Sequence, residues 1–317
     1  MARRKNKGSL KILITILCII GVVLIFAFGT NGSFTDNIIQ IWNNTIHYGE
    51  QQTNVEALVS GSNDGQLLMY VINTGNSDSI VVRTPDGQGI LIDAADDDDA
   101  SLILATLKDL GITRLSAAVA THPDADHIGS MDDVLEAIPT DKIYMTSYAA
   151  QTKTYDNMID AISESGTKEI LTFAGDSFEI GSVLFQVLSP QETELEDSNN
   201  SSIVLLMQYG ATRFLLEGDA ETEAIGTMLA AYAPEMDIDV IKIGHHGSSN
   251  ATTEELLDAS TPSLAVITCG EGNDYGHPHR ETLDLLQADH VKSLRTDENG
   301  DIAIFSDGNE ITYKTAA

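Results

Sequence analysis

Cysteine and basic residues are both scarce in this sequence. Only two cysteines, Cys18 and Cys269, occur in 317 residues, which excludes a disulfide framework and a zinc site built from thiolates. Any metal must therefore be bound by histidines and carboxylates. Lys and Arg number 17 against 48 Asp and Glu, for a formal net charge of −31 at pH 7. Because such a chain lacks the basic stripe that drives non-specific binding to nucleic acids, we expect no strong nucleic-acid-binding patch.

A long apolar run covers residues 12–29, where Thr15 is the one polar side chain. This length is just sufficient for a helix to cross a bilayer core. The preceding segment, 1–11, carries basic residues and no acidic one, so the positive-inside rule predicts a cytoplasmic tail, a transmembrane anchor and an extracytoplasmic remainder. A cleaved signal peptide is the alternative, although the run exceeds the ~7–15 apolar residues of a usual signal. We expect a single-pass protein of the cell membrane.

The remainder divides at about residue 65. Residues 30–64 are rich in Asn, Gln, Ser and Gly and are predicted to form a linker, whereas 65–317 form the domain. Short apolar segments separated by turn residues come first, and alternating strands and helices follow. Two successive halves of this kind predict an α/β fold with two sheets covered by helices. The acidic run 96–99 precedes an expected helix at 101–110, where it stabilises the helix N-terminus, an interpretation we prefer to calcium binding.

The segment from His122 to His127 holds two imidazoles and two carboxylates within six residues. It directly follows an expected buried strand, 115–120, and Pro123 and Gly129 mark it as a loop. Histidine nitrogens and aspartate oxygens are ligands that zinc, manganese and iron accept. A solvated polar loop is the alternative, but four ligand-type residues in this order favour a metal site.

Further polar motifs follow other expected strands: Asp93, Glu217-Gly218-Asp219, His245-His246 and His277-Pro278-His279. Any one of them alone is weak, because an aspartate after a strand is usually a helix cap and a histidine pair is often on the surface. Seven of the eight histidines lie outside the linker, and six of those occupy three short clusters at strand ends. Scattered structural histidines do not explain this clustering.

Together these motifs resemble the metallo-β-lactamase superfamily, and most closely the soluble domain of ComEC-type DNA-uptake proteins and their stand-alone relatives. The resemblance covers about residues 66–313 and keeps the family order. It implies an αββα sandwich with a binuclear metal site at the sheet edges. The motifs that carry it are Ile92-Asp93-Ala94, His-x-Asp-x-Asp-His-x-Gly from His122 to Gly129, Gly218-Asp219, His245-His246-Gly247-Ser248 and His277-Pro278-His279.

The resemblance also implies a role for each residue. His122 and Asp124 would bind a first metal, and Asp126 and His127 would bind a second. Asp219 would bind both metals, and Asp126 would also be a catalytic residue. One histidine of the His245-His246 pair would complete the second site. We assign this ligand role to His246, so that His245 would face the substrate. Asp93 would orient a ligand histidine. His277 or His279, with Ser248, would meet a phosphate or protonate a leaving group.

Two departures from the family pattern affect the first metal. Asp124 stands where the superfamily usually has a second histidine, and no histidine occurs between His127 and His245. Asn200, or its neighbour Asn199, matches the relatives' Asn-x-Ser position and is the candidate substitute. Since an oxygen-rich site is harder than one built from three histidines, the two divalent cations could be Mn²⁺ as well as Zn²⁺.

The expected function is that of a membrane-anchored, extracytoplasmic, metal-dependent phosphodiesterase. Two metals activate a water molecule and take up charge that develops on a phosphoryl oxygen. The substrate would be DNA or a cell-envelope phosphodiester such as a decorated teichoic acid, and the acidic composition shifts weight away from polymeric DNA. The alternatives are a lactonase or β-lactamase-type carbonyl hydrolase and a non-catalytic envelope binding module.

Overall fold

The structure, a computed structural model, describes residues 53–61, 65–191 and 197–317. The predicted basic tail, the anchor at 12–29 and most of the predicted linker lie outside these residues. Within the described ranges, no helix has the length and apolarity needed to cross a membrane. The chain divides into the units Met1–Glu50 and Gln51–Ala317, and all the described residues belong to the second unit.

One sheet has eight strands in the order β15-β14-β1-β2-β3-β4-β5-β6. Strands β1 to β3 form an antiparallel meander, and strands β3 to β6 run parallel to one another. The strands are β1 (Leu67–Val71), β2 (Ile80–Arg83), β3 (Gly89–Ile92), β4 (Leu115–Ala120), β5 (Lys142–Met145), β6 (Lys168–Leu171), β14 (Ile302–Ser306) and β15 (Ile311–Thr315).

The other sheet has seven strands in the order β13-β12-β11-β10-β9-β8-β7. It repeats the same plan, with antiparallel strands β7 to β10 followed by parallel strands β10 to β13. The strands are β7 (Ser177–Ile180), β8 (Val183–Ser189), β9 (Val204–Tyr209), β10 (Thr212–Leu216), β11 (Val240–Lys242), β12 (Leu264–Ile267) and β13 (Lys292–Arg295).

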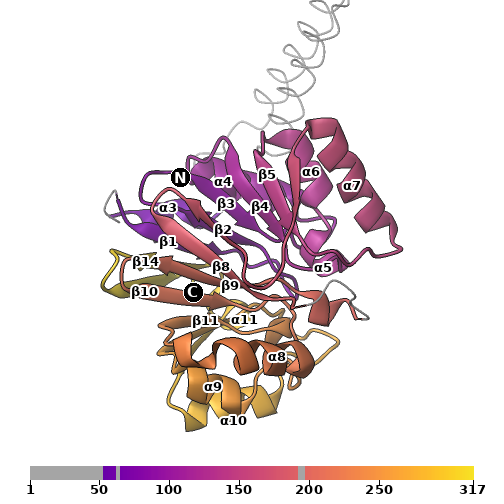
Figure 1. Ribbon diagram of the computed structural model, residues 1–317. Helices are drawn as coiled ribbons and strands as arrows, with labels where there is room; N and C mark the ends of the chain where they lie inside the picture. Colours follow the sequence, from indigo (N-terminus) through magenta and orange to yellow (C-terminus); the bar gives the residue numbers. More distant parts are fainter. Residues whose placement is uncertain (1–52, 62–64, 192–196) are drawn as a thin grey trace, which may run out of the picture. The chain divides into compact units, whose positions relative to one another are not determined.

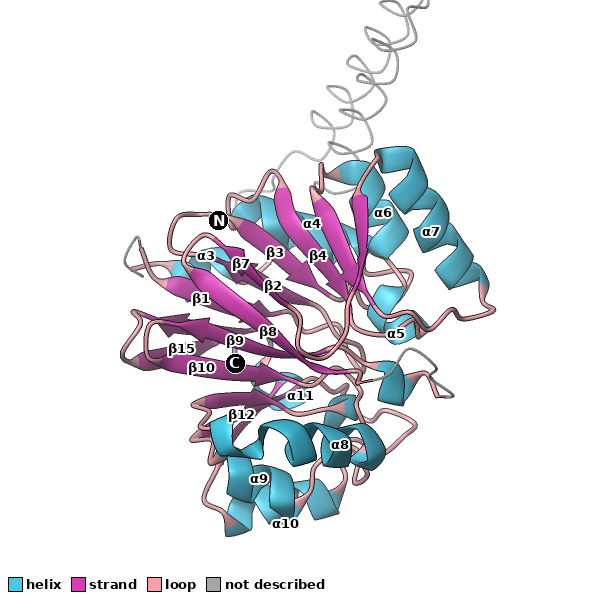
Figure 2. Cartoon of the chain, viewed as in Figure 1, coloured by secondary structure: helices cyan, strands magenta, loops and turns pink. Residues whose placement is uncertain are grey.

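Helices cover the outer face of each sheet, and the strands lie between the two helical layers (Figures 1 and 2). The alternation along β1 shows how the layers form: Leu67 and Met69 face the opposite sheet, whereas Leu68 and Tyr70 face the helices. Successive side chains of a strand point to opposite faces. The helices are α4 (Ala100–Asp109), α6 (Met131–Ala137) and α7 (Lys153–Ser165) on the first sheet and α8 (Thr222–Tyr232), α9 (Glu254–Ser260) and α10 (Arg280–Ala288) on the second. The predicted arrangement of two sheets covered by helices is confirmed.

The structure adds elements that the sequence did not predict. Helix α3 (Val55–Val59) lies within the expected linker, yet its Val55 and Leu58 are buried in the core. Strand β7 was not predicted from the sequence, because three of its four residues are exposed or only half-buried and give no apolar run. The C-terminal hairpin β14-β15 joins the first sheet beside β1, although it follows the second sheet in sequence. The apolar pattern of a segment predicts a strand but does not say which sheet the strand joins.

The parallel strands of both sheets end at the side of the molecule where the polar motifs follow them. Asp93 follows β3, Thr121 follows β4, and Glu217 follows β10. The two edges are connected directly, since the Ile203 amide donates to the Thr121 carbonyl at 2.9 Å. The carboxyl ends of parallel strands are the usual place for ligands in sheets of this kind.

Candidate metal centre

Asp93 fixes the loop that follows β4. It has a left-handed backbone, with φ 58°, which aims its side chain across the neighbouring strand. Its Oδ1 accepts from the Thr121 amide at 2.8 Å, and Oδ2 accepts from the Thr121 hydroxyl at 2.7 Å. The same Oδ2 lies 2.8 Å from His127 Nδ1. Because a carboxylate only accepts hydrogen bonds, His127 carries a proton on Nδ1, and Nε2 is the nitrogen that could bind a metal.

The turn that carries His127 is the short helix α5 (Ala125–Ile128), where the sequence predicted an irregular loop. The His127 carbonyl accepts from the Ala94 amide, and the Gly129 amide donates to the Ala95 carbonyl, both at 2.7 Å. Gly129 passes very close to the chain at Asp96, because an added Cβ would lie 2.4 Å from the Asp96 carbonyl carbon. Only glycine permits this approach, so the glycine of the motif holds α5 against the segment that follows Asp93.

The second sheet contributes Asp219 and the histidine pair. The Asp219 amide donates to the Ser202 hydroxyl at 3.1 Å, and the His245 amide donates to the Gly218 carbonyl at the same distance. His245 begins a tight turn, η3 (His245–Gly247), whose three residues all have positive φ. At Gly247, with φ 84°, an added Cβ would lie 2.6 Å from Pro278 Cβ. The turn therefore packs directly on the His277-Pro278-His279 segment.

Four side chains from these loops converge: Asp126, His127, Asp219 and His246. Each offers one ligand atom within 4.8 Å of the others. His127 Nε2 lies 3.1 Å from Asp219 Oδ1, and His246 Nε2 lies 3.3 Å from Asp126 Oδ2 and 3.7 Å from Asp219 Oδ2. Three of the four residues are buried, while Asp126 is partly open to solvent. Both sheets thus supply ligands to one point.

The buried atoms of this group fit a divalent cation. Among the described residues, neither His127 Nε2 nor Asp219 Oδ1 has a hydrogen-bond partner, although the two atoms are neighbours. Buried polar atoms are normally satisfied, because leaving one unpaired costs about 1–3 kcal/mol. A cation between them would satisfy both, and two imidazoles with two carboxylates suit zinc, manganese or iron.

The carboxylates and imidazoles of the site shift one another's pKa values in opposite directions. Burial lowers the pKa of His127, but the carboxylates of Asp219 and Asp93 outweigh burial and raise it well above its ordinary value. Burial raises the pKa of Asp219, but His127 and His246 outweigh it and hold that pKa well below its ordinary value. A metal must displace the second His127 proton, so metal affinity should fall with decreasing pH.

The predicted ligands of the first metal, His122 and Asp124, form a looser pair. His122 Nε2 lies 3.6 Å from Asp124 Oδ2, and its ring centroid lies 4.2 Å from that of His127. His122 Nε2 is buried with no hydrogen-bond partner among the described residues. The nearby His122 imidazole lowers the pKa of Asp124, as does the Ser198 hydroxyl, which donates to Asp124 Oδ1 at 2.6 Å. Neither residue belongs to a described group of three or more ligands.

Asn200 is not placed as the expected substitute ligand. Its Oδ1 accepts from the backbone amides of Glu221 and Ala224, each at 3.2 Å, and so caps the beginning of α8. The side-chain nitrogen of Asn199 donates to Glu221 Oε1 at 2.9 Å. Since both lone pairs of Asn200 Oδ1 are used, the structure argues against metal binding by this residue. The nearby residue that does contact a predicted ligand is Ser198, which the sequence analysis missed.

The two histidines of the pair occupy different positions. His246 is 1% exposed and belongs to the four-ligand group, whereas the His245 side chain is 23% exposed. His245 Nδ1 lies 3.1 Å from Glu221 Oε1, and its Nε2 lies 3.9 Å from Asp219 Oδ2. This placement agrees with His246 as ligand and His245 on the substrate side, an assignment that stays a prediction.

His279 has both ring nitrogens engaged by the backbone. Its Nδ1 accepts from the Ser249 amide at 3.0 Å, and its Nε2 lies 3.3 Å from the Tyr275 carbonyl. These contacts hold the ring as the Nε2–H tautomer and fasten the loop before α10. Ser248 is buried, its carbonyl accepting from the Thr282 hydroxyl at 3.2 Å. That His279 and Ser248 contact the substrate stays a prediction.

His277 faces the site more directly. Its ring centroid lies 5.4 Å from that of His245 and 6.0 Å from that of His246, and no described residue hydrogen-bonds to its Nδ1. Burial and the neighbouring imidazoles lower the pKa of His277 to about 4. The ring is therefore neutral near pH 7. On its other side it stacks against Tyr275 at 5.6 Å, a residue that is 71% exposed.

Two buried charged residues near the site were missed by the sequence analysis. Asp78 lies in the turn between β1 and β2, among residues whose pattern indicates a turn and not a site. Lys242 is the last residue of β11 and is 1% exposed. The available signal was a lysine inside the apolar run that leads to the histidine pair, since lysine is almost never fully buried without a partner.

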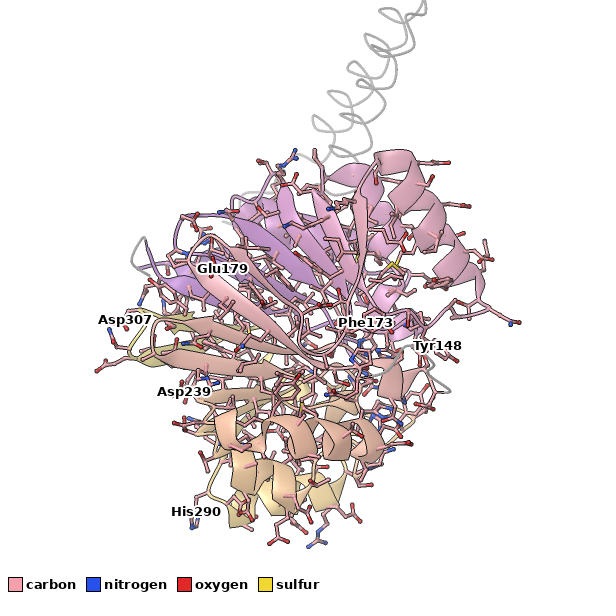
Figure 3. All side chains as sticks on the ribbon, viewed as in Figure 1. Tyr148, Phe173, Glu179, Asp239, His290 and Asp307 are labelled. Atoms are coloured by element: carbon pink, nitrogen blue, oxygen red, sulfur yellow. The ribbon has the colours of Figure 1, made fainter. Side chains whose placement is uncertain are left out.

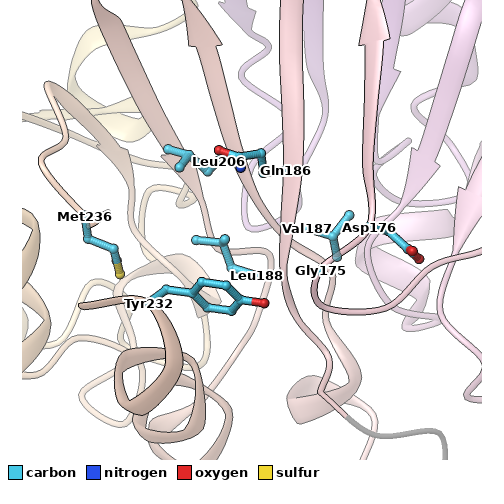
Figure 4. A pocket seen from close by; sticks show the side chains of 8 residues that line it. All are labelled: Gly175, Asp176, Gln186, Val187, Leu188, Leu206, Tyr232 and Met236. Carbon is cyan, nitrogen blue, oxygen red and sulfur yellow. The ribbon is translucent and has the colours of Figure 1, made fainter. Parts of the chain in front are cut away.

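Two other features lie apart from the cluster. His290, the seventh described histidine, is exposed beyond the end of α10 and projects from the lower edge of the molecule (Figure 3). A small pocket lies between β8, β9 and the end of α8, with Leu188, Leu206 and Tyr232 in its lining (Figure 4). None of its lining residues is a candidate ligand, so the pocket is separate from the metal centre.

Comparison with known proteins agrees with this geometry. The family model described as the metallo-beta-lactamase superfamily matches residues 72–271. The chain belongs to this superfamily. A solved structure of a CmlA beta-hydroxylase mutant is similar, with a TM-score of 0.51, 14% identity and coverage of 80% of this chain and 60% of that one. At that identity the likeness concerns the fold alone.

Among curated proteins, the chain resembles ComEC-type competence proteins. It is 32% identical over 258 residues to ComE operon protein 3 of Bacillus subtilis (strain 168), a match that covers 76% of this chain and 33% of that protein. It is 29% identical over 238 residues to Competence protein ComA of Neisseria gonorrhoeae, covering 75% and 32%. The chain thus spans about a third of the length of these relatives. The predicted family resemblance is confirmed.

We expect about two divalent metals per chain, with the His122–Asp124 position partly empty because it has few ligands. Elemental analysis after mild purification should give between one and two equivalents, and added Mn²⁺ or Zn²⁺ should raise the melting temperature. His290→Ala serves as the control and should keep the wild-type metal content. A well-folded chain with no metal and no metal-induced stabilisation would contradict the metal centre.

Proposed function

We propose that this chain is a metal-dependent phosphodiesterase anchored in the cell membrane, with its catalytic domain outside the cytoplasm. The observation that carries the catalytic part is the convergence of Asp126, His127, Asp219 and His246 from two sheets. The anchor and its orientation rest on the apolar run 12–29 and on the basic residues before it.

Divalent cations held by this group would supply Lewis acidity and lower the pKa of a bound water. The chain's own residues do the rest. Asp93 keeps the His127 ring in its ligand orientation through the 2.8 Å contact with Nδ1. His245 and His277 lie beside the ligands with their ring centroids 5.4 Å apart. A neutral His277 donates an N–H to a phosphate oxygen without bringing a second positive charge into the site.

Phosphodiesters suit this site better than lactams or lactones. The imidazoles of His245 and His277 add nitrogen donors beside the ligands, and a phosphodiester has two non-bridging oxygens to receive them. The excess of acidic residues disfavours a long polyanion that binds by backbone contacts alone. DNA and cell-envelope phosphodiesters both remain within the proposed class, and competence proteins are among the relatives by name.

A substrate panel tests the proposal. The full chain, loaded with Mn²⁺ or with Zn²⁺, is assayed on bis-p-nitrophenyl phosphate, nitrocefin and a lactone. We expect turnover of the phosphodiester alone, and none by Asp126→Ala. Faster turnover of nitrocefin or the lactone would assign the chain to the carbonyl hydrolases. A metal-loaded chain that hydrolyses nothing would favour the binding module.

A further inference from the structure

We infer that Asp78 is a positioning residue for the ligand His246, and that the buried ammonium of Lys242 holds Asp78 in place. This inference rests on the proposed metal centre. Asp78 Oδ2 lies 2.9 Å from Lys242 Nζ, and Asp78 Oδ1 lies 3.5 Å from His246 Nδ1. The Thr268 hydroxyl donates to Asp78 Oδ1, and the Thr268 carbonyl lies 3.2 Å from His246 Nδ1.

These contacts define the orientation of the His246 ring. Nδ1 faces an acceptor carbonyl and a carboxylate, so this nitrogen carries the proton. Nε2 faces Asp126 Oδ2 and Asp219 Oδ2 at 3.3 and 3.7 Å, and a metal bound there would take the place of a proton on this nitrogen. A carboxylate or carbonyl behind a ligand histidine fixes its tautomer and its direction. Asp78 thus lies behind His246 as Asp93 lies behind His127, but at 3.5 Å instead of 2.8 Å and together with the Thr268 carbonyl at 3.2 Å.

The pair is buried deeply enough for its charges to depend on each other. Asp78 is 2% and Lys242 is 1% exposed. Taking either charge out of water is costly unless both are paired and their remaining groups are hydrogen-bonded. Lys242 Nζ meets this condition by donating also to the Ile243 carbonyl at 2.9 Å.

Asp78, Asp93 and His127 also form a cluster with the spacing of a metal site. The contacts show why this cluster does not need a metal. Asp93 accepts from Thr121 through both oxygens and contacts His127 Nδ1, so its acceptors are in use. Asp78 already has a cation beside it, because the Lys242 ammonium lies at 2.9 Å. Lys242 therefore acts as a built-in cation.

Asp78 also links the two sheets that supply the ligands. Its backbone amide donates to the Asp126 carbonyl at 3.0 Å, and its carbonyl accepts from the Ala95 amide at 2.9 Å. Its side chain reaches Lys242 and His246 on the other sheet. Substitution of the side chain leaves the backbone contacts possible, so side-chain variants test the His246 connection specifically.

The test measures metal affinity of the full chain, by competition with a chelating dye, in Asp78→Asn, Lys242→Met and the double variant. Each single variant leaves one buried charge without its partner, so both affinity and stability should fall. The double variant removes both charges and should recover a wild-type melting temperature without metal. We expect it to bind metal about 10–100-fold more weakly, the usual effect of losing a partner behind a ligand.

Asp301→Asn is the matched control. Asp301 is likewise buried and hydrogen-bonded, to the Tyr70 hydroxyl at 2.8 Å, but it contacts no candidate ligand. It should lower stability and leave metal affinity unchanged. A double variant with wild-type affinity would show that the pair is only structural and would overturn the inference. A wild-type chain that binds no metal would instead contradict the metal centre on which the inference rests.

Discussion

Asp219→Ala should abolish phosphodiester hydrolysis while the fold survives. The Asp219 carboxylate lies between the two buried ligand histidines, with Oδ1 3.1 Å from His127 Nε2 and Oδ2 3.7 Å from His246 Nε2. By the family resemblance it would also contact both metals. Without it, the cations and imidazoles face one another with little compensating charge. We expect a loss beyond the ~10²–10³-fold that removal of a single electrostatic contact causes.

Asp126→Ala should have a similar effect for a related reason. Asp126 Oδ2 lies 3.3 Å from His246 Nε2, and Asp126 is the ligand of the group that is partly open to solvent. Turnover, metal content and circular dichroism are measured on the same preparations. Asp258→Ala, an exposed acidic residue of α9, is the control and should behave as wild type. An active Asp219→Ala enzyme would show that the residue roles taken from the family are misplaced.

The sequence predicted the location of the site because its chemistry is local to strand ends. Asp93 follows a buried strand directly, Asp219 and His246 lie within four residues of a strand end, and parallel strands bring such positions to one edge. The same reasoning grouped the His277 segment with them. Pattern and order along the chain were sufficient for this, since the interval between each strand and its polar residue is short.

Side-chain contacts between distant segments could not be predicted in this way. Asp78 and Lys242 are separated by most of the domain in sequence, and an aspartate in a turn usually faces solvent. Their pairing depends on how the two sheets pack. Likewise, Asn200 lies at the position of a family motif, but whether its amide caps α8 or approaches a metal depends on the path of the chain after η1 (Asn199–Ser201).

The C-terminal hairpin is a third case. Ile302 and Ile304 face the opposite sheet while Ala303 and Phe305 face the helices, so β14 is buried on both faces. The apolar run was visible in the sequence, but it fits either sheet equally well. Pairing with β1 is determined by tertiary contacts, among them the hydrogen bond from the Tyr70 hydroxyl to Asp301.

The two predicted roles of His277 differ in the protonation state that they require. The sequence left open whether His277 protonates a leaving group or meets the phosphate. Burial and the imidazoles of His246 and His245 lower the pKa of His277 to about 4, so only a small fraction of the ring is protonated at pH 7. A general acid works best with a pKa near the working pH. A neutral imidazole that donates an N–H to a phosphate oxygen is the role that fits this environment.

His277→Ala should therefore lose about 10²-fold in rate, the scale of one lost hydrogen-bond donor to the transition state. Metal content should be unchanged, because His277 is not among the four convergent ligands. The loss should be equal for bis-p-nitrophenyl phosphate and for a diester with an alkyl leaving group. His279→Ala is the companion variant, since its ring is fastened to the backbone on both sides. A loss that is much larger for the alkyl diester would contradict phosphate positioning, because only a poor leaving group needs a proton. Such a result would show that His277 is the general acid and that the bound substrate raises the pKa of His277.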